Sequence, residues 1–336
     1  DPAGARSEPR VGGSMSGGFL KRYWFLVVLL CLIPVGLWAP GPGLYIKEQG
    51  HIIPVFVGLM LGLSGFSMDT SSLVRQAFNW RAIVPVLAST FVLAPVAAYG
   101  LALWLRPEGD PHFLPAIMIM AAQAGTLASA LALTMMAGGN RELALVVTVL
   151  SNSLTVLLTP FILERAVGAT VQFNTSAMVL RMFLIVLLPI LIGQLLRPKL
   201  WERTESVRPA LKVAPQLIIL LFVYAGFASG ADKLRQGGEL LLRFLAACVA
   251  LHVILLGVMA VVSGLLKLSW PDRTAVVLCG SQKTLPNGIY IWSHFFPANP
   301  YGAVPLVLYH LFQLIVDTLL VSKFEKLNGV KNVNKH

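Results

Sequence analysis

Long apolar segments are the feature that most constrains this chain. A helix needs roughly 20 predominantly apolar residues to cross a bilayer. Only 12% of the 336 residues are charged, which is about half the share in a typical soluble domain. The sequence therefore predicts an all-α integral membrane protein with ten transmembrane helices in a lipid bilayer. The apolar segments lie at 20–39, 51–67, 80–105, 113–137, 142–163, 176–196, 210–229, 241–266, 270–296 and 303–323.

Charge sets the orientation of these segments. The net charge is +11, which in a soluble protein would favour nucleic-acid binding, but cytoplasmic loops of membrane proteins collect Lys and Arg. If the first segment starts inside, 16 Lys and Arg residues beyond the first 14 residues lie on the cytoplasmic side and seven on the other. We therefore expect both termini in the cytoplasm and no nucleic-acid partner.

The two halves of the chain resemble each other. Segment 51–73 aligns with segment 212–234 at an offset of 161 residues, which pairs Pro54 with Pro215. Each half contains five apolar segments, an odd number, so the second half must be inverted relative to the first. Inverted repeats are typical of secondary transporters. We expect a leader or expression remnant at 1–14, a first five-helix repeat at 15–167, a second inverted repeat at 168–326 and a polar tail at 327–336.

Two of the segments are interrupted by polar residues at their middle. Segment 113–137 contains Gln123 and Thr126, and segment 270–296 contains the run GSQKTLPNG at 280–288. Non-helical backbone at membrane depth is tolerated only where protein or a water-filled cavity satisfies its polar groups. The sequence therefore predicts that the fourth and ninth helices are broken halfway and cross near the membrane midplane.

Lys283 is the most informative residue of these interruptions. A charged side chain near the bilayer centre costs about 2.5–3.5 kcal/mol on insertion scales, and such residues mark functional sites by default. About a dozen residues of the segment flank it on each side, which disfavours a lysine that reaches the interface from a helix end. Lys283 could hold an anionic substrate, or it could take the place of a coupling cation by gaining and losing a proton.

Polar residues of the last segment share one helical face. His310, Gln313 and Asp317 are spaced at i, i+3 and i+7, so we expect them to point into the bundle. Asp317 is a candidate charge partner of Lys283; a structural network or a position near the cytoplasmic end is the alternative. His252, in segment 241–266, is interpreted as a satisfied core residue.

A further polar group could hold a cation. Thr148, Ser151 and Asn152 recur at helical spacing, and with Ser129 they could supply oxygen ligands to sodium. Packing of small polar residues between membrane helices is the alternative. The three cysteines, all in apolar segments, indicate neither a disulfide nor a structural metal framework, and no cofactor is expected beyond a coupling Na⁺ or H⁺.

The predicted site combines both interruptions with the last segment. The substrate-contacting set is Gln123, Thr126, Ser281, Gln282, Lys283, Thr284, Asn287, His310 and Gln313. The ion site is predicted at Ser129, Thr148, Ser151, Asn152 and Gln282.

Three motifs resemble a known family. GSQKTLP at 280–286, GTLASALAL at 125–133 and SNSLTVLLTP at 151–160 resemble the bile acid/sodium symporter superfamily (solute carrier family 10), in the branch of its orphan seventh member and bacterial homologues. The resemblance covers nearly the whole chain from Met15, and GSQKTLP is its most specific part. We expect the protein in a bacterial inner (plasma) membrane, although the sequence leaves open whether its outer side faces periplasm, an organelle lumen or the extracellular space.

The resemblance also implies a fold and a mechanism. Spans one, two, six and seven would form a panel domain and the other six a core domain, with spans four and nine crossing at their breaks. Family members move organic anions by alternating access, usually with two sodium ions. Ser129 and Thr148 stand nearest to one ion site, and Thr126 and Lys283 match substrate-contact positions.

The chain departs from the family pattern at the sodium sites. Sodium-coupled relatives have a glutamate before the break of span nine, an asparagine within that break and a glutamine in span three. This chain has Leu278, Lys283 and Thr90 there. Our hypothesis is that the Lys283 ammonium occupies the space of a sodium ion, so that coupling is to protons, to one residual sodium ion or to nothing.

The predicted function is secondary active transport of a small organic anion. The alternative is a non-transporting regulatory or receptor-like membrane protein on the same fold, because fold does not determine function. A membrane-embedded enzyme is disfavoured, because only Ser281 and Asp317 accompany Lys283 as candidate catalytic groups.

Overall fold

The computed structural model describes residues 15–69, 76–168, 173–236 and 238–328. The predicted leader and all but the first two residues of the predicted tail lie outside these ranges. Every regular element within them is a helix, in agreement with the predicted fold class. The elements are α1 (Met15–Trp38), α2 (Gly41–Glu48), α3 (Ile52–Ser67), α5 (Trp80–Ala88), η1 (Ser89–Leu93), α6 (Ala94–Leu105), α7 (Phe113–Ala121), α8 (Ala128–Met136), α9 (Arg141–Val167), α10 (Thr175–Met182), η2 (Phe183–Leu187), α11 (Leu188–Leu200), η3 (Glu202–Val207), α12 (Arg208–Gln236), α13 (Gly238–Leu265), α14 (Trp270–Ser281), α15 (Pro286–Phe295) and α16 (Val304–Leu327).

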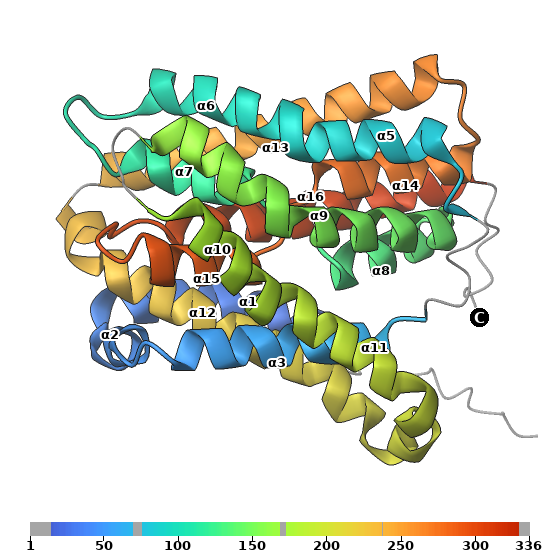
Figure 1. The fold of residues 1–336 in the computed structure, drawn as a ribbon, viewed down its shortest axis with the longest axis horizontal. Coiled ribbons are helices and arrows are strands. Elements are labelled where there is room, and N and C mark those ends of the chain that lie inside the picture. The colour runs from blue at the N-terminus through green and yellow to red at the C-terminus, as the bar shows by residue number, and fades with distance from the viewer. Residues whose placement is uncertain (1–14, 70–75, 169–172, 237, 329–336) are drawn as a thin grey trace, which may run out of the picture.

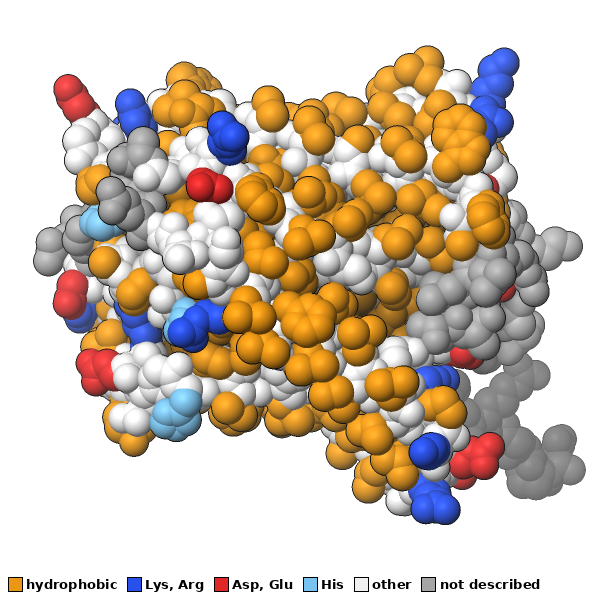
Figure 2. Space-filling view, viewed as in Figure 1, with side chains coloured by type: hydrophobic (Ala, Val, Ile, Leu, Met, Phe, Trp, Pro, Cys, Tyr) orange, Lys and Arg blue, Asp and Glu red, His pale blue; other side chains and the backbone are white. Residues whose placement is uncertain are grey.

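Within the described ranges, six continuous helices are long and apolar enough to cross a membrane. A seventh arises if α1 and α2, which are bent by 90° at their junction, count as one span. On the face shown in Figure 2, apolar side chains cover the middle and charged side chains gather toward the two ends. The protein is therefore an integral multi-pass membrane protein. The six helices are Trp80–Leu105, Arg141–Val167, Thr175–Leu200, Glu202–Asp232, Gly238–Leu265 and Val304–Leu327.

Two of these helices contain a π-helical turn that ends two residues before a proline. The turn η1 is followed by Pro95 and the turn η2 by Pro189. Proline lacks an N–H group and its ring clashes with the carbonyl four residues earlier, so a regular α-helix cannot continue through it. The wider π turn relieves this clash within a continuous helix. The positions of the two prolines therefore determine where the π turns η1 and η2 occur.

The elements form two groups (Figure 1). One group, which we call the panel, contains α1, α2, α3, α10, η2, α11 and α12. Its main contacts are reciprocal between the two halves of the chain, because α1 packs on α12 and α3 packs on α11. Gln194 of α11 donates hydrogen bonds to the carbonyls of Gly65 and Met68, and Arg197 donates to the carbonyl of Phe66, at and just beyond the C-terminal end of α3, where carbonyl groups lack the regular helical donor.

The other group, which we call the core, contains α5 to α9 and α13 to α16. In it α13 packs against α14 and α16, and α7 packs against α6, α9 and α16. Core and panel meet at α15, at the junction of α9 with α10 and η2, and where α12 contacts α13 and α16. By contrast, the main neighbours of α8 and α14 are all core elements. The panel therefore contacts the core mainly at one end of the bundle.

Glycine allows the closest approach within the panel. A Cβ atom placed on Gly193 of α11 would overlap the carbonyl oxygen of Gly62 and lie 2.6 Å from the backbone nitrogen of Phe66, both in α3. These obstacles are backbone atoms, which cannot rotate away. Glycine at this position therefore sets the distance between α3 and α11.

We predict that Gly193→Ala lowers the free energy of unfolding by about 1–3 kcal/mol, the usual cost of overpacking. Thermal unfolding of the purified protein in detergent measures this change. The matched control is Gly257→Ala in α13, where an added Cβ meets nothing within 4 Å. Equal melting temperatures for the two variants would contradict the close packing of α3 on α11.

Candidate functional site

The two predicted breaks are present and they contact each other. Helix α7 ends at Ala121 and α8 begins at Ala128, while α14 ends at Ser281 and α15 begins at Pro286. The amide of Thr284 in the second break donates a hydrogen bond of 2.8 Å to the carbonyl of Ala124 in the first. Segments 160 residues apart in sequence therefore form one site.

In the first break, the carbonyl groups that lack a helical donor are hydrogen-bonded by other parts of the protein. A buried carbonyl without a donor costs on the order of 1–3 kcal/mol, so each one needs a partner. Four consecutive carbonyl groups of this break each accept a hydrogen bond. The donors are Thr159 for Ala122, Lys283 Nζ for Gln123, the Thr284 amide for Ala124 and Asn152 for Gly125.

The second break is held by side chains of α16 and η1. The Lys283 amide donates to Gln313 Oε1 at 2.8 Å, and Gln313 Nε2 donates to the Lys283 carbonyl at 3.0 Å. The Tyr309 hydroxyl donates to the Ser281 carbonyl at 2.6 Å. Ser89 Oγ donates to the Gly280 carbonyl at 2.7 Å. The Gln313 side chain therefore pairs with both the backbone amide and the backbone carbonyl of Lys283.

The Lys283 side chain extends from the second break to the first break and η1. It is 2% exposed, and its Nζ donates to the carbonyl oxygens of Thr90 at 2.8 Å and Gln123 at 3.0 Å. In the part of the chain that the structure describes, it makes no ion pair. The ammonium group is therefore held by backbone dipoles rather than by a carboxylate.

The π turn η1 explains why Thr90 offers its carbonyl. The amide of Ala94 bonds to Ser89, five residues earlier, and in this pattern the next donor to Thr90 would be the nitrogen of residue 95. That residue is proline, which has no N–H. The carbonyl of Thr90 is therefore left without a helical partner, and the Lys283 ammonium binds it.

Asp317 orients Gln282 at the centre of the crossing. It is fully buried, and its Oδ2 accepts a hydrogen bond of 2.6 Å from Gln282 Nε2. The amide oxygen of Gln282 then faces the first break, where it accepts hydrogen bonds from Thr126 and Ser129. The other oxygen of Asp317 lies 3.2 Å from His252 Nε2. The Gln282 amide and the Asp317 carboxylate therefore join α8, α13, α16 and the end of α14.

The predicted contact between Lys283 and Asp317 is not formed. Lys283 Nζ reaches η1 and the first break, whereas Asp317 contacts His252 and Gln282. Consecutive residues of an extended backbone point to opposite sides, and the backbone of Gln282 is extended. This is why Gln282, rather than Lys283, reaches Asp317.

The predicted ion-site residues lie beside the first break. Asn152 donates to the carbonyls of Gly125 and Thr148, while Thr148 and Ser151 donate to carbonyls of their own helix. Ser129 contacts Thr126 and Gln282. Among the described residues, buried polar atoms without a hydrogen-bond partner include Asn152 Oδ1, Gln123 Oε1 and both side-chain polar atoms of Asn287. Such atoms are available to an ion or a substrate.

The structure brings most of the predicted residues together and adds others. His310 contacts Gln313, so both belong to the support of the second break. Sequence reasoning overlooked Ser89, Thr159 and Tyr309 as donors to the breaks, and it assigned His252 to the core alone. A signal for Thr90 existed, because Pro95 follows it by five residues.

Comparisons with known proteins agree on one family. The model of the SBF-like CPA transporter family matches residues 23–326. The putative symporter YfeH of Escherichia coli K12 is 26% identical over 308 residues, covering 90% of this chain and 92% of that protein. Sodium/bile acid cotransporter 7 of Xenopus tropicalis is 23% identical over 314 residues, covering 90% and 91%.

A plant protein shows a similar relationship over a shorter length. The probable sodium/metabolite cotransporter BASS4 of Arabidopsis thaliana, a chloroplast protein, is 27% identical over 282 residues, covering 77% of this chain and 63% of that protein. The family model spans nearly the whole chain, including both breaks and the last helix. This protein belongs to the SBF-like CPA transporter family and is a transporter, not an enzyme.

Proposed function

We propose that the protein is a secondary active transporter that moves a small organic anion across the membrane by alternating access. The observation that carries this proposal is the contact between two broken helices around a buried, carbonyl-bound lysine. Paired discontinuous helices surround the substrate and ion sites of many secondary transporters. The names of the relatives, which include a symporter and sodium/bile acid cotransporters, support the same function.

Helix ends at the crossing favour an anionic substrate. The N-termini of α8 and α15 both start at the breaks, and the partial positive charge of a helix N-terminus attracts anions. Asn287 lies in the first turn of α15, is fully buried and has no partner for its side-chain amide within the described residues. We propose that Asn287, Thr126 and Thr284 contact the substrate carboxylate.

Lys283 supplies the positive charge that a coupling ion would otherwise bring. Two backbone carbonyls hold its ammonium, and unwound backbone carbonyls are also the groups that bind sodium in transporters with broken helices. A sodium ion and this ammonium would compete for the same oxygens. We propose that Lys283 replaces one sodium ion, while Ser129, Thr148, Asn152 and Gln282 retain oxygen atoms for a second cation.

The packing supports two domains that move relative to each other. We propose ten spans: the six continuous helices, α1 with α2, α3, and the two broken pairs. The reciprocal contacts α1–α12 and α3–α11 fit inverted repeats at 15–167 and 168–326. Core and panel contact mainly at the end that charge places outside the cytoplasm. The described conformation then fits access from the cytoplasmic side, with both termini cytoplasmic in an inner membrane.

Uptake into liposomes tests the transport function directly. The probes are taurocholate, succinate and benzoate, each offered with an inward sodium gradient, an inward proton gradient or no gradient. We expect gradient-driven accumulation of at least one anion. Binding of an anion without accumulation under any gradient would contradict transport and favour a receptor-like function.

The role of Lys283 predicts a change in sodium response. Lys283→Ala vacates the carbonyls of Thr90 and Gln123, and we expect it to lower the free energy of unfolding by about 1–3 kcal/mol per unsatisfied group. Sodium chloride in place of choline chloride should raise the melting temperature of Lys283→Ala more than that of the wild type, because sodium binds the vacated oxygens.

Lys199→Ala, at an exposed position near the end of α11, is the control and should respond to sodium as the wild type does. If Lys283→Ala kept the sodium response, the pH dependence and the uptake rate of the wild type, the proposal that Lys283 replaces a sodium ion would be excluded.

Asp317 is predicted to act by positioning Gln282. Asp317→Leu leaves the Gln282 amide and His252 without their acceptor, and we expect a loss of about 1–3 kcal/mol in the free energy of unfolding. Asp317→Asn can still accept from Gln282 and should lose less stability, yet its free amide can turn the Gln282 oxygen away from Thr126 and slow uptake.

Asp232→Asn is the matched control for thermal unfolding, because within the described residues Asp232 forms an exposed i,i+3 ion pair with Arg235 and such pairs contribute about 0–1 kcal/mol. Wild-type stability in Asp317→Leu would show that the network of Asp317 is not formed.

A further inference from the structure

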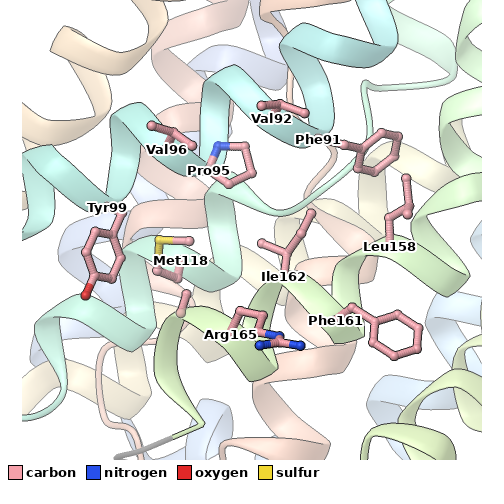
Figure 3. A pocket seen from close by; sticks show the side chains of 11 residues that line it. Phe91, Val92, Pro95, Val96, Tyr99, Met118, Leu158, Phe161, Ile162 and Arg165 are labelled. Carbon is pink, nitrogen blue, oxygen red and sulfur yellow. The ribbon is translucent and has the colours of Figure 1, made fainter.

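A groove on the core surface lies apart from the crossing of the breaks. It encloses about 580 Å³ and is bounded by η1, α6, α7 and α9 (Figure 3). Of its eleven lining residues, Arg165 is the one that carries a charge, and Tyr99 has the other strongly polar tip. The groove is therefore an apolar trough with a cationic group at its wall.

The open side of the groove faces the hydrocarbon of the membrane. Val92 and Val96 on one wall are 61% and 67% exposed, and Phe161 on the other wall is 53% exposed. These residues belong to helices Trp80–Leu105 and Arg141–Val167, which are long and apolar enough to span a bilayer. Molecules that enter this groove therefore come from the lipid phase.

The cationic group lies at one end of the groove. Arg165 is in the last turn of α9, the end that charge places at the outer membrane interface, and Tyr99 lies midway along α6. Arg165 is exposed, and within the described residues it forms no hydrogen bond or ion pair. Its neighbour Glu164 does not line the groove. A guanidinium next to an apolar trough fits an amphipathic anion, because Arg binds phosphate oxygens in a bidentate manner.

We propose that this groove binds a phospholipid with an anionic headgroup. One acyl chain lies along Val92, Val96 and Ile162, and the Arg165 guanidinium holds the phosphate. A basic residue near the membrane surface contributes about 1 kcal/mol to the binding of an anionic lipid. A zwitterionic lipid with the same acyl chains also carries a cationic group, which repels the guanidinium and offsets part of this attraction. The site should therefore select headgroup charge as well as accept the chain.

The groove adjoins the segment that holds Lys283. Phe91 and Val92 of η1 line its inner end, and the preceding residue, Thr90, accepts the hydrogen bond of Lys283 Nζ. A bound acyl chain would therefore pack against one side of the π turn while the ammonium contacts the other. Binding of lipid can be measured without transport, so this proposal does not depend on the proposed function.

Thermal unfolding of the full chain in detergent tests the proposal. Phosphatidylglycerol and phosphatidylcholine with the same acyl chains are titrated, and soluble glycerol phosphate supplies the headgroup chemistry alone. We expect phosphatidylglycerol to stabilise the wild type at a lower concentration than phosphatidylcholine does, because a ligand of the folded state raises the melting temperature. Arg165→Gln should lose about fivefold in apparent affinity for phosphatidylglycerol.

Two further variants separate charge from shape. Arg106→Gln removes an equal charge at the exposed C-terminal end of α6, outside the groove, and should keep the preference for phosphatidylglycerol. Val96→Trp narrows the groove without changing charge and should weaken both lipids. Equal stabilisation of the wild type by the two lipids, an unchanged preference in Arg165→Gln, or the full effect from glycerol phosphate alone would each overturn the proposal.

Discussion

The need to satisfy backbone polar groups in an apolar interior governs the centre of this protein. Interrupting a helix inside a membrane frees amide and carbonyl groups that neither lipid nor apolar side chains can pair. Here each break resolves part of that need for the other, through the hydrogen bond from Thr284 to Ala124. Side chains of α9, α16 and η1 supply most of the remaining partners. The positions of those helices therefore follow from the breaks.

Lys283 belongs to this same arrangement. Its ammonium is a donor for two carbonyls that have no helical partner, one freed by the first break and one freed by Pro95. Burial of a charge is expensive, and a packed apolar side chain of similar volume is often at least as stable. The presence of a lysine here therefore needs a reason other than stability, and the role that we propose for Lys283 in transport supplies one.

Packing within the panel differs from packing between the panel and the core. Within the panel, glycines bring α3 and α11 into backbone contact, and such contact resists sliding. Between panel and core, the contacts are concentrated at one end of the bundle. A rigid unit that touches its partner at one end can tilt about that end. The groove on the core lies beside η1, so the lipid that we propose for it would contact the segment that holds the lysine.

The sequence by itself determined the membrane class, the interruption of two helices and the family. These follow from local properties: lengths of apolar runs, polar residues at their middle, and the GSQKTLP motif. The structure bears out the multi-pass helical fold and both breaks, and the family model matches 23–326. Ten spans in two inverted repeats and the assigned site roles stay proposals.

Only the tertiary structure decided which groups pair at the site. The sequence indicated Asp317 as a charge partner of Lys283, but the extended backbone at Gln282 directs that side chain to Asp317 and sends the lysine to Thr90. The sequence also placed His252 in the core, without its contact to Asp317. Partner choice depends on distances between segments far apart in the chain, which periodicity and composition do not encode. Apolar length is a property of one segment, whereas a hydrogen bond across a crossing is a property of two.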